Sequence, residues 1–367
     1  MNSTLSLYLH IPFCKSKCPY CDFYSSKASE EEYQKYTDIL KSKIIYWSEK
    51  SNKTISTIYF GGGTPSILGT QRLCSLLDTI KTNFSISSNA EITLEINPES
   101  GKNLDFDKLR YCGFNRLSIG TQSAIQDELK ALGRIHTADE TKLTVQKAKQ
   151  SGFHNISLDL MMGIPHQTIE SLKRSIDFCN SCEVTHISSY ILKIEKGTHF
   201  DIIKNKLDLP NEDYQAELYL SAVKELEKLG YKQYEISNFS KKGFESKHNI
   251  NYWKCKEYIG IGPSAHSYFE GKRFYYNDNI SDFENNITVY DCQGGTKEEY
   301  IMLSLRLKEG LSFAEYKSIF GSSLSDSIIK KVEKYAKLGY MNIDNNKINF
   351  TPKGYLVSNT ILSDLIY

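Results

Sequence analysis

The sequence predicts an α/β protein that consists of a partial (β/α)6 barrel, TIM-like but open, and a small C-terminal winged-helix-like α+β domain. In the first half, six short apolar runs alternate with longer helix-like stretches, which indicates parallel strands joined by right-handed crossovers. Six such units are fewer than the eight that close a barrel. In the last quarter, the pattern changes to short helices followed by a hairpin. A chain of 367 residues has room for a barrel-sized domain and a smaller one.

The expected strands are rich in Ile, Leu, Tyr or Phe, and several are bounded by Gly, Pro or Asn. They are Ser6–Ile11, Thr57–Phe60, Glu91–Ile96, Arg116–Gly120, Ile156–Met161 and His186–Leu192. The helix-like stretches between them are Ser29–Glu49, Thr70–Asn83, Phe106–Cys112, Ser123–Ser151 and Ile169–Cys182. This order places the barrel at residues 1–230.

The second half of the chain begins with a polar linker and a helix at Tyr214–Leu229, followed by an irregular, aromatic stretch at Lys241–Gly262. We interpret residues 231–293 as a connecting region and residues 294–367 as the winged-helix-like domain. Its expected elements are helices at Lys297–Leu307, Ser312–Phe320 and Ser325–Leu338 and a hairpin that ends with Lys347–Phe350. Such domains often bind DNA, but no cluster of basic residues supports that interpretation here.

Composition and charge narrow the possible partners and the compartment. Lys and Arg number 45 against 44 Asp and Glu, so no overall positive charge favours nucleic acid or an anionic membrane. We find no secretory signal and no apolar run of the ~18 residues that span a bilayer. The nine cysteines are scattered rather than arranged as a disulfide framework. We therefore expect a cytoplasmic protein that uses cysteines for metal chemistry rather than for disulfides.

Three of these cysteines form a compact motif directly after the first expected strand, at Cys14, Cys18 and Cys21. Thiolates at C-x3-C-x2-C spacing suit an iron–sulfur cluster or zinc. Structural zinc needs four ligands, and the next cysteine is Cys74. Three ligands favour a [4Fe–4S] cluster whose free iron can chelate the amino and carboxylate groups of S-adenosylmethionine. Zinc and three unrelated cysteines are the alternatives. A second pair, Cys179 and Cys182, is interpreted as two half-buried helical cysteines.

Polar residues stand at the ends of successive strands, where the working residues of βα barrels gather. Glycines at Gly61–Gly63 let the backbone approach a ligand closely. Glu95, Gln122 and Asp159 interrupt apolar strands, and a buried polar side chain is costly unless it is paired or functional. Together they favour a common ligand. Arg134 either reaches a ligand carboxylate or is an ordinary exposed helical arginine.

The sequence resembles the radical SAM family that contains oxygen-independent coproporphyrinogen III oxidase and its relative, a haem chaperone. The matching segments are Tyr8–Phe23, Phe60–Ser66, Glu95–Pro98, Ser118–Ser123, Asp159–Pro165 and Gly260–Ser267. The resemblance implies a radical SAM barrel in which a reduced [4Fe–4S] cluster cleaves S-adenosylmethionine. It also implies that this cofactor is contacted by Tyr8, Tyr20, Gly62, Gly63, Thr64, Glu95, Gln122, Arg134 and Asp159.

Two positions separate the two kinds of relative. The oxidase carries a further cysteine two residues after the third ligand, where this chain has Phe23. The chaperone carries a His-Asn-x-x-Tyr-Trp segment, which matches His248–Trp253 here. An imidazole can ligate haem iron, and the neighbouring aromatic rings can stack on a porphyrin. The resemblance therefore implies haem ligation by His248 and a candidate haem-binding segment within residues 231–293. We interpret His266 as a structural loop histidine, with haem ligation as its weaker alternative.

The leading hypothesis is a haem chaperone with a radical SAM core, which binds haem and delivers it to apo-haemoproteins of the membrane respiratory chain. It carries the further expectations of peripheral membrane association and a homodimer. The alternative is the coproporphyrinogen III oxidase, a radical oxidative decarboxylase, against which the departure at Phe23 argues. A DNA-binding regulator is a third hypothesis. Whether the chain uses radical chemistry stays open at this point.

Overall fold

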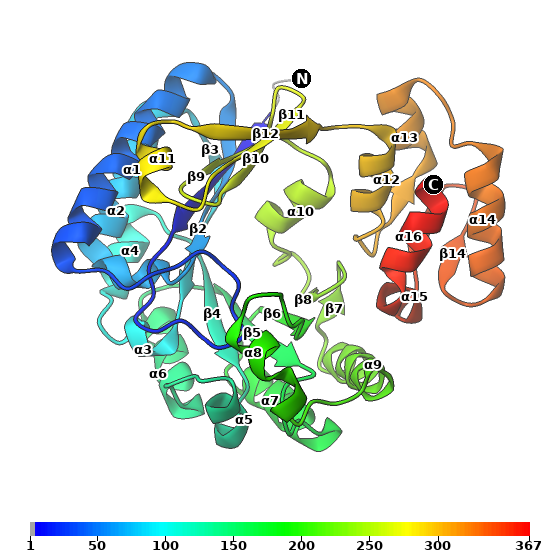
Figure 1. Cartoon of the computed structure of the whole chain (residues 1–367), viewed down its shortest axis with the longest axis horizontal. Coiled ribbons are helices and arrows are strands. Elements are labelled where there is room, and N and C mark those ends of the chain that lie inside the picture. The colour runs from blue at the N-terminus through cyan, green and yellow to red at the C-terminus, as the bar shows by residue number, and fades with distance from the viewer. Residues whose placement is uncertain (1–3) are drawn as a thin grey trace.

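A computed structural model describes residues 4–367 of the chain, and six parallel strands form the centre of its larger domain (Figure 1). Strands that follow one another in the sequence are also neighbours in the sheet. The six expected strands are confirmed, with ends that shift by a few residues. They are β1 (Thr4–Ile11), β2 (Thr54–Gly62), β3 (Ile86–Ile96), β4 (Arg116–Gln122), β5 (Asn155–Met162) and β6 (His186–Ile191).

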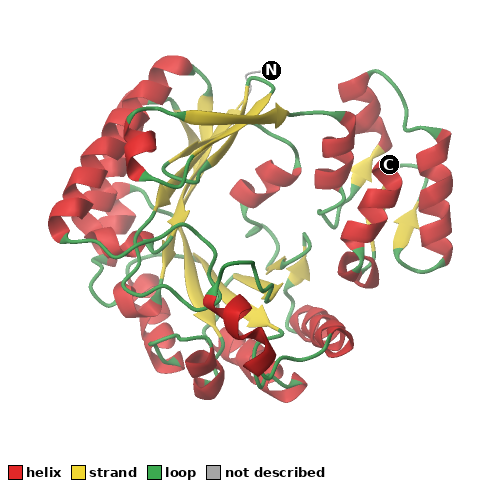
Figure 2. Ribbon diagram, in the orientation of Figure 1, coloured by secondary structure: helices red, strands yellow, loops and turns green. Residues whose placement is uncertain are grey.

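Helices cover the outer face of this sheet, and Figure 2 shows this layer outside the strands. It consists of α1 (Glu30–Lys50), α2 (Gly69–Asn83), α3 (Pro98–Gly101), α4 (Phe106–Cys112), α5 (Gln126–Ala131), α6 (Ala138–Gln150) and α7 (Ile169–Ser181). The prediction of a single helix at Ser123–Ser151 is wrong, because the chain forms α5 and α6 there. Gly133 adopts a left-handed conformation, with φ of 67°, which ends the first helix. A capping box between Thr137 and Glu140 then starts the second.

The barrel stays open, as the sequence predicts, and the sheet continues at both edges to twelve strands. Residues 231–293, which the sequence presents as a connecting region, supply these edge strands. At one edge, β8 (Asn238–Ser240) pairs antiparallel with β6 and with β7 (Lys232–Gln233). At the other edge, β9 (Tyr258–Ile261) pairs parallel with β1. The hairpin strands β10 (His266–Phe269), β11 (Lys272–Tyr276) and β12 (Thr288–Gln293) extend that edge.

The interpretation of Lys241–Gly262 as irregular is wrong. This stretch forms β9 and a short helix, α10 (Lys247–Trp253), which contacts β2 and the smaller domain (Figure 1). Seven largely polar residues show too little apolar periodicity to predict a helix, and its position depends on contacts that are distant in sequence. The remaining helices of the larger domain are α8 (His199–Ile203), α9 (Glu212–Lys228) and α11 (Ile280–Glu284).

The smaller domain contains the expected helices and hairpin, together with a short strand and two terminal helices that were not predicted. A three-stranded antiparallel sheet runs in the order β13, β15, β14. The elements are α12 (Lys297–Ser304), β13 (Leu311–Ser312), α13 (Phe313–Phe320), α14 (Asp326–Lys337), β14 (Met341–Ile343), β15 (Lys347–Phe350), α15 (Pro352–Leu356) and α16 (Ser358–Ile366).

The cysteines outside the C-x3-C-x2-C motif separate into paired and unpaired residues. Cys74 on α2 and Cys112 at the end of α4 form a disulfide with a Cα–Cα distance of 5.7 Å. The prediction against disulfides is therefore wrong for this pair, because the packing of α2 against α4 brings together two cysteines that are 38 positions apart. Cys179 and Cys182 are unbonded and buried at the end of α7. Within residues 4–367, no helix has the length and apolar character needed to cross a bilayer.

Candidate functional site

The cysteine motif lies in the loop that follows β1, at the carboxyl end of the parallel strands. A backbone bridge between Phe13 and Ser26 closes this loop, and the amide of Cys14 donates to the Ser26 carbonyl at 3.0 Å. The loop therefore holds Cys14, Cys18 and Cys21 together at one end of the barrel. All three thiols are unbonded and half-buried.

The surroundings of these sulfurs fit an iron–sulfur cluster. The Thr64 hydroxyl lies 3.4 Å from the Cys14 sulfur, and Arg134 donates through Nη1 to the Cys18 sulfur at 3.5 Å. Burial, with smaller contributions from the other two thiols, raises the pKa of Cys21 to about 11, so three thiolates here require a cationic partner. Hydrogen bonds to thiolate sulfur are a usual means of tuning such clusters.

The zinc alternative gains no support from the geometry. The cysteine loop supplies three unbonded thiols, and polar side chains contact the sulfurs of Cys14 and Cys18. This donor set fits a cubane that keeps one iron available to a ligand.

A cavity beside the three cysteines collects most of the residues that the sequence predicts to contact S-adenosylmethionine. Gly63 shows why glycine is needed in its wall, because a Cβ there would lie 2.6 Å from the Phe13 carbonyl oxygen and 3.0 Å from the Cys14 sulfur. The turn after β2 can thus pack directly against the cysteine loop. The predicted residues that line this cavity are Cys14, Cys18, Cys21, Tyr20, Gly62, Gly63, Thr64, Glu95, Gln122 and Asp159.

Two carboxylates line this cavity, from β3 and β5. Glu95 accepts hydrogen bonds from the Tyr59 hydroxyl at 2.7 Å and from the Gly62 amide at 3.2 Å. Burial raises the pKa of Glu95 to about 7 despite these donors. Asp159 accepts from Ser118 at 3.1 Å, and burial also raises the pKa of its carboxyl. Two half-buried carboxylates in one cavity favour a cationic ligand, since a positive charge between them offsets the cost of their desolvation.

Arg134 lies next to this cavity, half-buried and outside any helix, and its guanidinium binds protein groups through Nη1 and Nη2. Besides Cys18, its guanidinium donates through Nη2 to Asn97 Oδ1 at 2.7 Å and to the Gly120 carbonyl at 2.8 Å. Asn97 in turn donates to Thr64 at 2.9 Å. Arg134 therefore joins the cysteine loop to the ends of β3 and β4 and acts here as a positioning residue.

The cavity is also lined by several residues that were not among the predicted contacts, and Asn97 and Tyr190 are two of them. Asn97 follows Glu95 at a spacing of two, so strand alternation could have placed both side chains on the same face. Tyr190 stands near the end of the sixth strand, where the rule about strand ends applies as well. Its hydroxyl donates to Gln122 at 2.9 Å. Gln122 has a left-handed backbone, with φ of 65°, a strained conformation typical of functional sites.

Comparisons with known proteins agree with this geometry. The Radical SAM superfamily matches residues 8–179, and the HemN C-terminal domain matches residues 297–357. The heme chaperone HemW of Bacillus subtilis is 34% identical over 97% of both chains, and HemW of Buchnera aphidicola from Schizaphis graminum is 36% identical over 98% of this chain and 97% of that protein. The chain belongs to the HemW family of radical SAM proteins.

The same relationship is visible in three dimensions. The structure of coproporphyrinogen III oxidase (HemN) from Escherichia coli superposes with a TM-score of 0.83, covering 100% of this chain and 90% of that chain. The sequence identity is 21%, so this likeness supports the fold and not the activity. A radical SAM barrel followed by a HemN C-terminal domain is thus the architecture of this HemW family member.

A second cavity, of about 480 Å³, shares Phe23 with the first and is lined by the predicted residues Tyr8 and His248. Its volume lies in the usual range of ligand pockets. We call it the aromatic cavity, because it is lined by Tyr8, Phe23, Tyr24, Tyr59, Tyr252 and Tyr258, together with His10, Asp22, His248, Asn249, Ser264, Ala265 and His266. Tyr8 therefore lines this cavity and not the one beside the cysteines. The wide aromatic lining suits a flat, largely apolar ligand.

His248 lies in this cavity with both ring nitrogens occupied. Nδ1 pairs with the Thr57 hydroxyl and Nε2 with the Tyr252 hydroxyl, both at 2.8 Å. Burial, and to a smaller extent Arg116, lowers the pKa of His248 to about 3, so the imidazole is neutral. To ligate iron, His248 must give up one of these partners. Leaving a buried hydroxyl without a partner costs about 1–3 kcal/mol.

Helix α10, which carries His248, is anchored by a carboxylate from the barrel. Glu91 at the start of the buried part of β3 accepts from the amides of Lys247 and His248, each at 3.0 Å. The Ser246 hydroxyl also donates to Glu91, at 3.4 Å. These bonds cap the first turn of α10 with a negative charge, which is favourable at a helix N-terminus.

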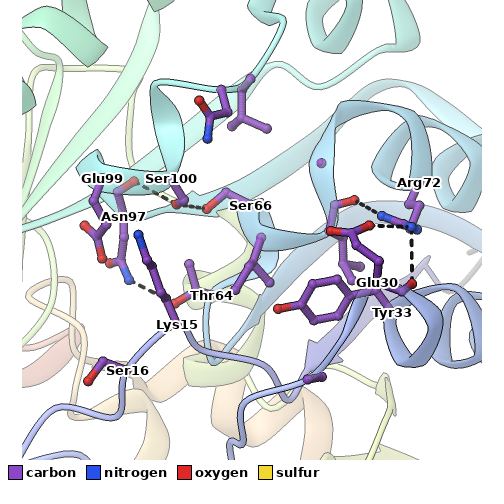
Figure 3. A pocket seen from close by; sticks show the side chains of 16 residues that line it. Lys15, Ser16, Glu30, Tyr33, Thr64, Ser66, Arg72, Asn97, Glu99 and Ser100 are labelled. Atoms are coloured by element: carbon purple, nitrogen blue, oxygen red, sulfur yellow. Dashed lines mark hydrogen bonds and ion pairs between the residues drawn. The ribbon is translucent and has the colours of Figure 1, made fainter.

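A third cavity lies behind the cysteine loop and shares Thr64 and Asn97 with the first (Figure 3). Its polar groups are largely paired with one another. Arg72 binds Glu30 at 2.8 Å, and Ser66 binds Ser100 at 2.5 Å. Charges of both signs line this cavity, so they do not select a ligand of either sign.

Proposed function

We propose that this chain is a haem chaperone with a radical SAM core. Cys14, Cys18 and Cys21 hold a [4Fe–4S] cluster, the adjoining cavity binds S-adenosylmethionine, and the aromatic cavity binds haem for delivery to apo-haemoproteins. The relatives that share nearly the full length of this chain carry the name heme chaperone HemW. When bound, the cluster would supply the electron for reductive cleavage of S-adenosylmethionine.

The observation that carries this proposal is the wall shared by the two cavities. Tyr59 donates its hydroxyl to Glu95 in the cluster cavity at 2.7 Å. The same ring stacks on His248 in the aromatic cavity, with 4.9 Å between the ring centroids. A site for a cationic cofactor and a site for a flat macrocycle are therefore one side chain apart.

The residues of the cluster cavity have separable tasks in this proposal. Glu95 and Asp159 attract the ammonium and sulfonium charges of S-adenosylmethionine. The backbone at Gly62 and Gly63 admits the ligand close to the sulfurs, and Gln122 presents an amide held by Tyr190. Tyr8 belongs to the shared wall, where its hydroxyl pairs with His10 Nδ1 at 3.0 Å.

Phe23 supports the chaperone over the oxidase. This ring is 61% exposed and lines both cavities, so an apolar group stands where the oxidase has a thiol. We infer that this HemW family member does not turn over coproporphyrinogen. An anaerobic assay of the reconstituted protein tests this inference, and steady formation of protoporphyrinogen with several turnovers per protein would contradict it.

The central test is transfer of haem. The full-length protein, reconstituted anaerobically with its cluster, is loaded with haemin and mixed with apomyoglobin, and the Soret spectrum of holomyoglobin is followed. We expect stoichiometric haem binding and transfer that is faster than from an equal amount of haem-loaded serum albumin. Absence of haem binding would refute the proposed function.

The finer expectations about partners are part of this proposal. The recipients are haemoproteins of the membrane respiratory chain, the chaperone meets them as a cytoplasmic protein at the membrane surface, and it forms a homodimer. Co-sedimentation with vesicles that contain an apo-cytochrome complex tests the first two points. Light scattering of the cluster-loaded protein tests the third, and a monomer at micromolar concentration would contradict it.

A further inference from the structure

The three imidazoles of the aromatic cavity differ in what their ring nitrogens contact. His10 uses Nδ1 for the Tyr8 hydroxyl at 3.0 Å and Nε2 for the Tyr24 carbonyl at 3.1 Å. His248 uses both nitrogens for hydroxyls, as described above. Among residues 4–367, no hydrogen-bond partner meets either nitrogen of His266, which is exposed and lines the same cavity.

The position of His266 is fixed by a tightly packed turn. Gly260 on β9 lies so close to the His266 backbone that a Cβ there would be 2.2 Å from its carbonyl oxygen. Gly262, with φ of 139°, packs in the same way against the His10 backbone. The ring of His266 stacks on Tyr275, with centroids 4.9 Å apart. A preorganised imidazole with free nitrogens therefore stands at the cavity.

We propose that His266 supplies the nitrogen that ligates haem iron in this cavity, while His248 stays hydrogen-bonded and holds the cavity wall. This inference rests on the proposed function, and it reassigns the ligand within that function. Ligation forms one Fe–N bond through the lone pair of His266 and breaks no protein hydrogen bond. Ligation by His248 would require its ring to break the hydrogen bond to the Thr57 hydroxyl or to the Tyr252 hydroxyl.

Desolvation at the turn supports the same assignment, because burial lowers the pKa of His266 and keeps the ring neutral. A neutral imidazole is the form that ligates a metal. His10 is less suited to the role, since its two ring nitrogens are bonded to the Tyr8 hydroxyl and to the backbone carbonyl of Tyr24. Of the three imidazoles that line the aromatic cavity, His266 is thus the one whose ring nitrogens have no hydrogen-bond partner among the described residues.

The experiment compares haemin titrations of the cluster-loaded full-length protein and three variants: His266→Ala, His248→Ala and His154→Ala. His154 is an exposed histidine outside the cavity and serves as the matched control. We expect His266→Ala to lose the imidazole-ligated Soret and low-spin EPR signatures and to bind haemin at least tenfold more weakly. Added imidazole should restore the spectrum, which loss of a merely structural histidine would not allow.

We expect His248→Ala to keep the imidazole-ligated Soret and low-spin EPR signatures while binding haemin more weakly, because part of the cavity wall is removed. We expect His154→Ala to keep both the wild-type spectrum and the wild-type affinity. If His248→Ala destabilises the protein, His248→Gln provides a milder variant with the same prediction. An unchanged Soret maximum and affinity in His266→Ala would overturn the ligand assignment while leaving the chaperone function intact. Failure of the wild-type protein to bind haemin would overturn both.

Discussion

The anchoring of α10 by Glu91 gives a prediction whose size follows from the structure. In Glu91→Gln, one carboxylate oxygen becomes an NH2 group that faces a backbone N–H. One of the two 3.0 Å bonds to the amides of Lys247 and His248 is then lost. Hydrogen bonds to charged groups contribute about 1.5–3 kcal/mol, and a negative charge at a helix N-terminus adds about 0.3–1 kcal/mol. We therefore expect the free energy of unfolding to fall by about 2–4 kcal/mol.

The assay is urea unfolding followed by circular dichroism, combined with hydrogen exchange of the α10 amides. Glu49→Gln serves as the control, because Glu49 is exposed near the end of α1. We expect the control to change stability by less than about 0.5 kcal/mol, and Glu91→Gln to accelerate exchange throughout α10. If both variants unfold at the same urea concentration and α10 stays protected, Glu91 does not anchor the helix.

Three further predictions concern the two cavities. Burial raises the pKa of Glu95 to about 7, and the ionised carboxylate attracts a cation. The affinity for S-adenosylmethionine should therefore rise with pH, by up to about tenfold per pH unit below pH 7. Calorimetry should find that the affinity of Glu95→Gln does not change over the same pH range. Gly63→Ala should push the cysteine loop aside and lower the iron content after reconstitution, whereas Ser16→Ala in the same loop should not; equal iron content would contradict this. Tyr59→Phe removes the hydroxyl bonded to Glu95 but keeps the ring on His248. It should therefore weaken any effect that S-adenosylmethionine and haem have on each other's affinity, measured by titrating one ligand with and without the other. An unchanged coupling would contradict the argument from the shared wall.

The gathering of the predicted residues in the cavity beside the cysteines could be predicted because it follows a rule of the fold. Parallel strands align their carboxyl ends, so Glu95, Gln122 and Asp159 had to meet at one end of the barrel. The cysteine spacing required only a local loop. Neither inference needed the details of side-chain packing. For this reason, the predicted residues and the cavity found beside the cysteines agree closely.

The parts that were not predicted depend on contacts between distant residues. Glu91 and His248 are 157 positions apart, and nothing near either residue indicates the other. The pairing of Cys74 with Cys112 likewise follows from the packing of α2 on α4. The sequence also could not show that Arg134 binds three protein acceptors, since they come from three different segments.

The two histidines of the aromatic cavity show how structure changes a motif-based inference. His248 stands in the segment that marks the family, and a motif directs attention to it first. Its buried, doubly bonded ring suits a wall that keeps Tyr59 and Tyr252 in place. His266 stands in a glycine-rich turn, a pattern that indicates a structural role. Its ring nitrogens nevertheless have no hydrogen-bond partner among residues 4–367. A residue that binds haem and then releases it should have a small difference in free energy between its haem-bound and haem-free states. An exposed imidazole without protein partners meets that requirement better than one whose hydrogen bonds must be broken at every cycle.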